Sequence, residues 1–179
     1  KAIEIKPDYA EAYNNLGNTF TQLKKFEEAE VNYNKAIELK PDHAEIYNNL
    51  GVALDNALKI DKSIDYFKKA IQINPKYINA FYNLGNAYLY LEKYDEAIKK
   101  YSQILELNPN HTRAQQNIID ILNFHTVDNK NTNSIIVANN NLKKIKSNFT
   151  FNHSSKITDL SNFFENFKKI IQRHNKDLT

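Results

Sequence analysis

Apolar residues recur with the period of an α-helix along the first two thirds of the chain, in short stretches of two alternating kinds. In the first kind they lie at positions i, i+3, i+4 and i+7, as in Tyr13, Leu16, Gly17 and Phe20. In the second kind small and large residues mix, as in Ala29, Tyr33, Ala36 and Ile37. Positions three and four apart share one helix face, so each stretch predicts an amphipathic helix with one buried stripe.

These helix pairs repeat with a period of 34 residues, a step that every proline and every glycine keeps (Pro7, Pro41, Pro75, Pro109; Gly17, Gly51, Gly85). Self-similarity at such a fixed period is the signature of a stacked repeat protein. The aligned positions are Tyr13, Tyr47 and Phe81; Leu16, Leu50 and Leu84; Phe20, Leu54 and Tyr88; Ala29, Ser63 and Ala97; Tyr33, Phe67 and Tyr101; Ala36, Ala70 and Ile104.

The repeated pattern resembles the tetratricopeptide repeat family. The resemblance implies an all-α, right-handed solenoid of helix-turn-helix units, with a concave and a convex surface. The apolar patterns after the third repeat predict a C-terminal helical extension. A helix pair of this size buries its apolar face only against its neighbours. Glycine inside a helix costs about 1 kcal/mol relative to alanine, so we expect each glycine to allow a close approach of the partner helix. We expect each proline to end one helix and begin the next turn.

The repeat divides the chain into segments of different character. Lys1–Gly17 matches Lys35–Gly51 at all but three positions, and the chain contains no methionine, so we expect a fragment of a longer protein. The expected segments are the tail of a preceding repeat (1–9), three repeats (10–43, 44–77 and 78–111), a closing helix (112–123), an Asn-rich linker (124–153) and an amphipathic helix (154–179).

That last helix either packs on the end of the solenoid or begins a further domain. Its Phe-rich face would suit either role. An alternative is a helix lying in a membrane interface, with its cations on the polar side (Lys168, Lys169, Arg173 and Lys176). We consider the packed helix the better interpretation, because a Phe-rich core face explains the same pattern.

One polar position recurs on the helix side opposite the buried stripe. A turn of 100° per residue places the sixth residue of each repeat there, facing the expected concave surface. That position holds asparagine four times: Asn15, Asn49, Asn83 and Asn117. Repeats of the O-linked N-acetylglucosamine transferase type resemble this, and the resemblance implies an asparagine ladder that clamps the backbone of an extended peptide. A carboxamide offers both a donor and an acceptor to a peptide unit.

Further polar and aromatic residues are candidates for the same peptide-binding surface. These are Asn14, Asn18, Asn48, Asn86, Tyr82 and Tyr90. The chain is rich in asparagine throughout, so biased composition is the competing interpretation for the first four of them and for the ladder itself. Retention of asparagine at one position in four units favours the ladder over biased composition. Tyrosine is also common on packed faces of this repeat, which is the competing interpretation for Tyr82 and Tyr90.

A second known use of the family is a clamp for the carboxylates of a peptide C-terminus. By resemblance, such a clamp needs asparagine at Asn18 and Asn49, which this chain has. It also needs lysine or arginine at Asn14, Asn79 and Asn83, where this chain has asparagine. Charge-assisted capture of a carboxylate is therefore not expected.

Composition and charge exclude several other classes. The chain has no cysteine and only three glycines, so it has neither a thiol site nor a Gly-rich phosphate loop. No histidine has a second ligand at metal spacing, and we expect no metal, cofactor or catalytic residue. Residues 1–123 carry 15 basic and 17 acidic groups, which disfavours nucleic acid as a partner. No apolar run is long enough to span a bilayer.

The sequence therefore predicts a protein-interaction module that binds a protein or peptide in extended conformation, with the cytoplasm as the default location. The alternative is the substrate-selecting region of an enzyme, glycosyltransferase-like or other, whose catalytic domain lies outside the fragment. The partner, the oligomeric state and the source of the chain are not predicted.

Overall fold

The computed structural model describes residues 7–124, together with Glu165 and Lys169. The stretch 7–124 consists of seven helices and contains no strand. The helices are α1 (Pro7–Gln22), α2 (Phe26–Leu39), α3 (Ala44–Asn56), α4 (Ile60–Ile73), α5 (Ile78–Tyr90), α6 (Tyr94–Leu107) and α7 (Thr112–Phe124). Residues 1–6 of the expected tail (1–9), residues 125–153 of the expected linker (124–153) and the expected helix (154–179) lie outside the described residues, apart from Glu165 and Lys169. Residues 7–9 belong to α1 and Phe124 to α7.

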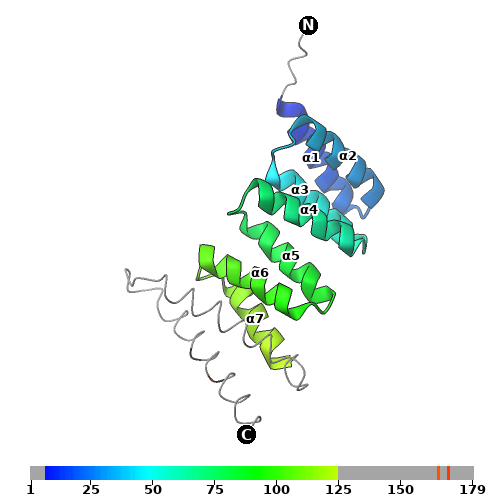
Figure 1. Ribbon diagram of the computed structural model, residues 1–179. Coiled ribbons are helices and arrows are strands. Elements are labelled where there is room, and N and C mark those ends of the chain that lie inside the picture. Colours follow the sequence, from blue (N-terminus) through cyan, green and yellow to red (C-terminus); the bar gives the residue numbers. More distant parts are fainter. Residues whose placement is uncertain (1–6, 125–164, 166–168, 170–179) are drawn as a thin grey trace. The chain divides into compact units, whose positions relative to one another are not determined.

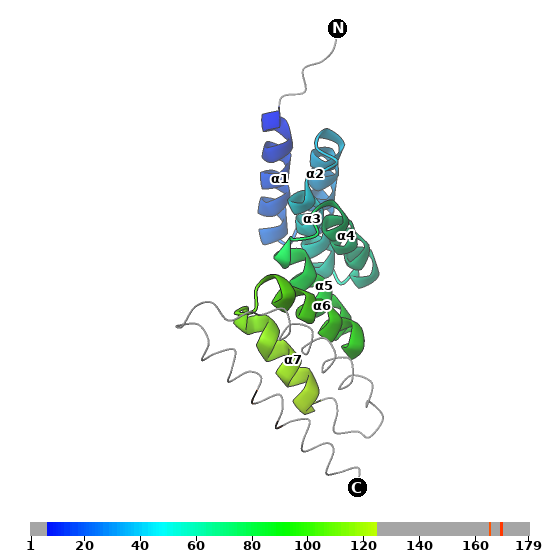
Figure 2. The ribbon, with the colours of Figure 1, turned by 60° about the vertical axis from the view of Figure 1, so that its left-hand side comes forward.

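The chain divides into two compact units between Ala87 and Tyr88. The first unit contains α1 to α4 and most of α5, and the second contains the end of α5, α6 and α7. In the first unit α1 packs on α2, α3 packs on α4, and α3 also contacts α2 and α1 (Figures 1 and 2). In the second unit α6 packs on α7. Successive helix pairs are therefore layered in the first unit, as the 34-residue period predicts.

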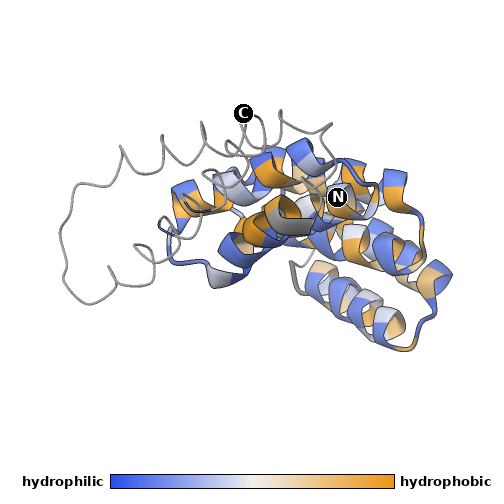
Figure 3. Ribbon diagram, turned by 90° about the horizontal axis from the view of Figure 1, so that it is seen from below, coloured by the Kyte–Doolittle hydropathy of each residue, from blue (hydrophilic) through white to orange (hydrophobic). Residues whose placement is uncertain are grey.

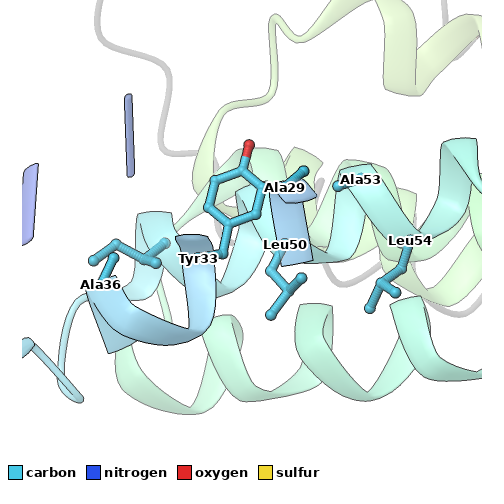
Figure 4. Close-up of a cluster of buried hydrophobic side chains, with 7 residues drawn as sticks. Ala29, Tyr33, Ala36, Leu50, Ala53 and Leu54 are labelled. Carbon is cyan, nitrogen blue, oxygen red and sulfur yellow. The ribbon is translucent and has the colours of Figure 1, made fainter. Parts of the chain in front are cut away.

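The core of the first unit lies between the second helix of one pair and the first helix of the next. Ala29, Tyr33 and Ala36 of α2 lie against Leu50 and its neighbours on α3 (Figure 4). Leu50 is fully buried, which stabilises the fold by about 1.5 to 3 kcal/mol relative to an exposed leucine. Each helix presents apolar and polar residues on different sides, visible as alternating orange and blue ribbon (Figure 3). The predicted buried stripe of α2 is thus confirmed.

Two of the glycines allow the close helix approach that their position predicts. A Cβ atom at Gly17 would lie 2.6 Å from Cε1 of Tyr33, and one at Gly51 would lie 2.6 Å from Cε1 of Phe67. Both aromatic rings belong to the second helix of the same pair, and both side chains are almost completely buried. The ring edge occupies the space that any larger residue would need, so the close-packing role is confirmed at these two positions.

The prediction that Leu16 belongs to a buried stripe is wrong. Leu16 is 46% exposed, whereas its equivalents Leu50 and Leu84 are buried. Leu50 is covered because α2 of the preceding pair packs on α3. No described helix precedes α1, so the corresponding side of α1 is open to solvent within the described residues.

One residue in the turn inside each helix pair has a left-handed backbone conformation, which the sequence does not predict. Lys24, Leu58 and Glu92 have positive φ angles of 57°, 60° and 56°, respectively. They occupy the same repeat position. At Leu58 the adjacent amides bond back to the end of α3, with Lys59 N donating to Leu54 O and Leu58 N donating to Asp55 O, each at 2.9 Å. This is the Schellman arrangement, in which the left-handed residue is commonly glycine.

The prolines behave in two ways. Pro41, Pro75 and Pro109 lie in the turns between helix pairs, as predicted, but Pro7 begins α1 rather than ending a helix. Proline suits a first helical position because the missing N–H has no partner there. The proline carbonyls also anchor the next helix: the Tyr47 hydroxyl donates to Pro41 O at 3.0 Å, and Gln115 Nε2 donates to Pro109 O at 2.6 Å.

Candidate peptide-binding face

The four asparagines of the expected ladder all lie on first helices. Asn15 on α1 is exposed, Asn49 on α3 and Asn83 on α5 are partly exposed, and Asn117 is partly exposed on α7. Asn15, Asn49 and Asn83 belong to the first unit and Asn117 to the second. None of the four side chains is buried in the core.

The structure joins the ladder residues of the first unit to other candidates by hydrogen bonds. Asn49 Nδ2 donates to Asn14 Oδ1 at 3.1 Å, and Asn83 Nδ2 donates to Asn48 Oδ1 at 2.9 Å. Each bond crosses from one first helix to the preceding one, with the same separation of 35 residues. We call these two contacts the amide pairs. The surface that carries both pairs and Asn15 is called the amide face.

The acceptors of the amide pairs are more deeply placed than the donors. Asn14 is 9% exposed and Asn48 is 5% exposed. A buried carboxamide needs hydrogen-bond partners, and removing one costs about 1 to 3 kcal/mol. Asn14 and Asn48 are thus packed between neighbouring repeats, whereas Asn49 and Asn83 remain partly open to solvent.

Asn18 is partly buried and bonds to the second helix of its own pair. The Tyr33 hydroxyl donates to Asn18 Oδ1 at 2.7 Å, and the Thr21 hydroxyl lies 3.3 Å from the same phenol oxygen. Burial raises the pKa of Tyr33, and the hydrogen bond with Thr21 offsets part of that rise. The hydrogen bond that Asn18 accepts from Tyr33 therefore supports the fold.

A sequence signal for this role of Asn18 exists but is easily overlooked. In the second repeat the equivalent residues are Val52 and Phe67. Asparagine thus accompanies tyrosine, which has a hydroxyl to satisfy, and valine accompanies phenylalanine, which has none. The third repeat again combines asparagine, at Asn86, with tyrosine.

The two candidate tyrosines have different surroundings. Tyr82 is partly buried on α5 and occupies the repeat position of Asn14 and Asn48. Tyr90, at the end of the same helix, is 64% exposed. An exposed tyrosine can bury a large surface against a ligand. Tyr90 therefore stays a binding candidate, in the second unit.

Two ion pairs join helices of the first unit, one within a repeat and one between repeats. Lys40 Nζ lies 3.2 Å from Glu11 Oε1, and Lys59 Nζ lies 3.3 Å from Glu30 Oε2. Burial raises the pKa of Asp55, and a hydrogen bond from Ser63 opposes that shift. No cation stands next to Asn14, Asn49 or Asn83 in the described hydrogen bonds and ion pairs.

The described part of the chain offers neither a cluster of metal ligands nor a membrane-spanning helix. Within residues 7–124 no group of three or more histidine, aspartate or glutamate side chains is arranged to hold a metal ion. None of the helices α1 to α7 combines the length and the apolar character that crossing a bilayer requires.

The architecture and the amide face define a helical-repeat protein. A model of the tetratricopeptide repeat family matches residues 10–43, 44–77 and 78–111, which is more than half of the sequence. The chain belongs to the tetratricopeptide repeat family. A comparison with curated protein sequences gave no match.

Several solved structures are similar to this chain. The first repeat domain of Spaghetti (RPAP3), bound to the HSP90 peptide SRMEEVD, is 27% identical with a TM-score of 0.62, covering 67% of this chain and 95% of that one. The second repeat domain of human RPAP3, in complex with the HSP70 peptide SGPTIEEVD, is 26% identical with a TM-score of 0.60, covering 64% and 97%. MamA is 26% identical with a TM-score of 0.62, covering 80% and 84%.

Proposed function

We propose that this chain is a protein-interaction module that binds an extended peptide along the amide face, with Asn15, Asn49 and Asn83 contacting the peptide backbone. The observation that carries the proposal is the position of these amides. They stand at one register on successive first helices, and each keeps part of its side chain open to solvent. Asn117 occupies the same repeat position on α7, in the second unit.

The chemistry of the amides suits a peptide backbone better than a particular side chain. A carboxamide can accept from a peptide N–H and donate to a peptide C=O. Packed helices lie about 8 to 10 Å apart, which corresponds to roughly three residues of an extended chain at about 3.3 Å each. The amides could therefore contact every third residue of a bound strand and would tolerate many sequences.

The class of ligand differs from the peptides of the similar structures. SRMEEVD and SGPTIEEVD, the peptides bound to the two RPAP3 domains, end in acidic residues. In this chain the positions where a carboxylate clamp requires cations hold Asn14, Asn79 and Asn83. Glu45 is exposed on α3 and adds a negative charge to the first repeats. We therefore infer a neutral, extended segment as the ligand.

Hydrogen bonds from the amides supply only part of the affinity. Each contributes about 0.5 to 1.5 kcal/mol net, while association costs about 4 to 15 kcal/mol. Burial of apolar surface has to supply the remainder, and Tyr82 is the aromatic candidate for it in the first unit, as Tyr90 is in the second. Asn86 is a further polar candidate beside them.

Retention of an array of neutral 15-residue peptides tests the proposal. Asn15→Ala is the cleanest variant, because its side chain is exposed and forms neither amide pair. We expect the variant to weaken retention about two- to tenfold for most binding peptides, the range of one neutral hydrogen bond. Asn34→Ala, on the second helix α2, is the matched control and should leave retention unchanged. Equal retention by Asn15→Ala and Asn34→Ala across the array would count against backbone recognition by the ladder.

A second experiment tests the ligand class. SRMEEVD, the peptide of the similar RPAP3 domain, is compared with the same peptide carrying amides in place of its acidic groups. We expect no gain from the carboxylates, since the described positions of the clamp hold Asn14, Asn79 and Asn83 in place of cations. A tenfold or greater preference for the acidic form would contradict the inference of a neutral ligand.

A further inference from the structure

Within the first unit, the amide pairs hold two ladder residues, Asn49 and Asn83, but not the third, Asn15. Asn49 Nδ2 and Asn83 Nδ2 are each held by an acceptor on the preceding first helix, at 3.1 and 2.9 Å. Asn15 forms neither pair and is exposed. The same asparagine is thus fixed at two repeats and exposed at the first, within a single compact unit.

The hydrogen bond determines which way each amide points. Because Nδ2 of Asn49 faces Asn14, its Oδ1 points away from Asn14, on the other side of the Cβ–Cγ axis within the amide plane. A carboxamide has two N–H groups and one carbonyl oxygen. The bond uses one N–H of Asn49, so its carbonyl and its second N–H keep a fixed direction. Asn48 imposes the same orientation on Asn83.

We propose that Asn14 and Asn48 are positioning residues that hold Asn49 and Asn83 in one orientation before a ligand arrives. The inference rests on the proposed function, since it concerns the ladder that would bind the peptide. Asn14 and Asn48 are 9% and 5% exposed, so little of either side chain is open to a ligand. Their contribution to binding is indirect and acts through the neighbouring amide.

The benefit of this arrangement is entropic. A side chain that must be immobilised on binding weakens the complex, and a side chain that is already fixed does not. For one asparagine we expect a difference of about two- to tenfold in the dissociation constant. The contacts of Asn49 and Asn83 with the peptide should accordingly contribute more to affinity than the contact of Asn15, although all three are the same residue type.

Substitution of the acceptor separates positioning from direct binding. Asn14→Leu removes Oδ1 and keeps a residue of similar size, while Asn14→Asp keeps an oxygen that accepts from Asn49. Asn14→Ala serves as a second variant if the leucine does not fold. All variants are made in the full 179-residue chain, with thermal unfolding as the control for folding.

Two measurements are made on each variant. The first is the hydrogen exchange of the Asn49 side-chain amide by nuclear magnetic resonance. The second is the dissociation constant for the most strongly retained neutral peptide of the array, measured in 0.5 M salt to screen the aspartate charge. We expect Asn14→Leu to speed exchange and weaken binding two- to tenfold, and Asn14→Asp to preserve both.

The outcomes distinguish the two proposals. Faster exchange in Asn14→Leu with an unchanged dissociation constant would overturn the positioning role and leave peptide binding in place. An Asn14→Asp variant that binds as weakly as Asn14→Leu would also overturn it, because the acceptor would then be irrelevant. If no peptide of the array binds the unaltered chain, the proposed function itself fails, whatever the exchange data show.

Discussion

Replacing Leu58 by glycine should stabilise the fold, although it removes a large apolar side chain. Leu58 has a φ of 60°, and a residue with a Cβ atom pays about 1 to 2 kcal/mol in this left-handed region. The side chain is 72% exposed, so its loss sacrifices little buried surface. Glycine adopts this conformation without steric conflict.

The net gain is smaller than the relief of strain. Glycine also makes the unfolded chain more flexible, which lowers stability by about 0.4 to 1 kcal/mol. We therefore expect Leu58→Gly to raise the free energy of unfolding by about 0.5 to 1 kcal/mol. Lys24 and Glu92 have the same conformation, and because each residue lies in a different turn the triple variant should gain about 1.5 to 3 kcal/mol by simple addition.

Urea denaturation followed by circular dichroism measures this gain as a higher midpoint at unchanged slope. Leu58→Ala is the matched control, because alanine shortens the side chain yet keeps the Cβ atom. We expect no stabilisation from alanine. If Leu58→Ala were as stable as Leu58→Gly, backbone strain would not be the cause, and the reasoning from the positive φ would be refuted.

Three further predictions concern the interior of the first unit. Asn18→Val should lower the free energy of unfolding by about 1 to 3 kcal/mol, since it removes the acceptor of the Tyr33 hydroxyl. Adding Tyr33→Phe should recover most of that loss in the same urea assay. A double variant as unstable as the single variant would contradict the pairing of Asn18 with Tyr33. Burial raises the pKa of Asp55 above its ordinary 3.8, so the folded state binds this proton more tightly and stability falls as pH rises from the unfolded pKa through the folded one. Asp55→Asn should therefore be more stable than the unaltered chain at pH 7 and equal to it near pH 3; a stability difference that does not change with pH would argue against this linkage. Ala36→Leu should lower the free energy of unfolding by about 1 to 3 kcal/mol through overpacking, because Ala36 is fully buried. Glu38→Leu, at an exposed position of the same helix, should change the free energy of unfolding little. Similar effects at both positions would mean that the helix crossing at Ala36 is not tightly packed.

The sequence predicted a structural role correctly where a residue type at one repeat position has a single physical explanation. Gly17 and Gly51 recur in the middle of a helical pattern, where glycine is unfavourable unless space is short, and the structure shows an aromatic ring against each. Leu16 illustrates the limit of the same reasoning. Its pattern is identical to that of Leu50, but burial depends on a neighbouring helix pair, which the pattern does not supply.

The sequence likewise predicts only part of the amide face. The register of Asn49 and Asn83 on successive first helices follows from the 34-residue step alone. Their partners do not, because Asn14 and Asn48 lie on the preceding helix. Adjacent asparagines with different roles look alike in an asparagine-rich sequence.

The sequence by itself determined the helical repeat, its period and the residues that share each helix face, because these depend on spacing along one chain. Tertiary structure alone decided that Leu16 is exposed while Leu50 is buried, and that two ladder amides are held by their neighbours. These features depend on how closely and at what angle helices meet. Hydrogen bonds respond to differences of a few tenths of an ångström, which periodicity does not encode.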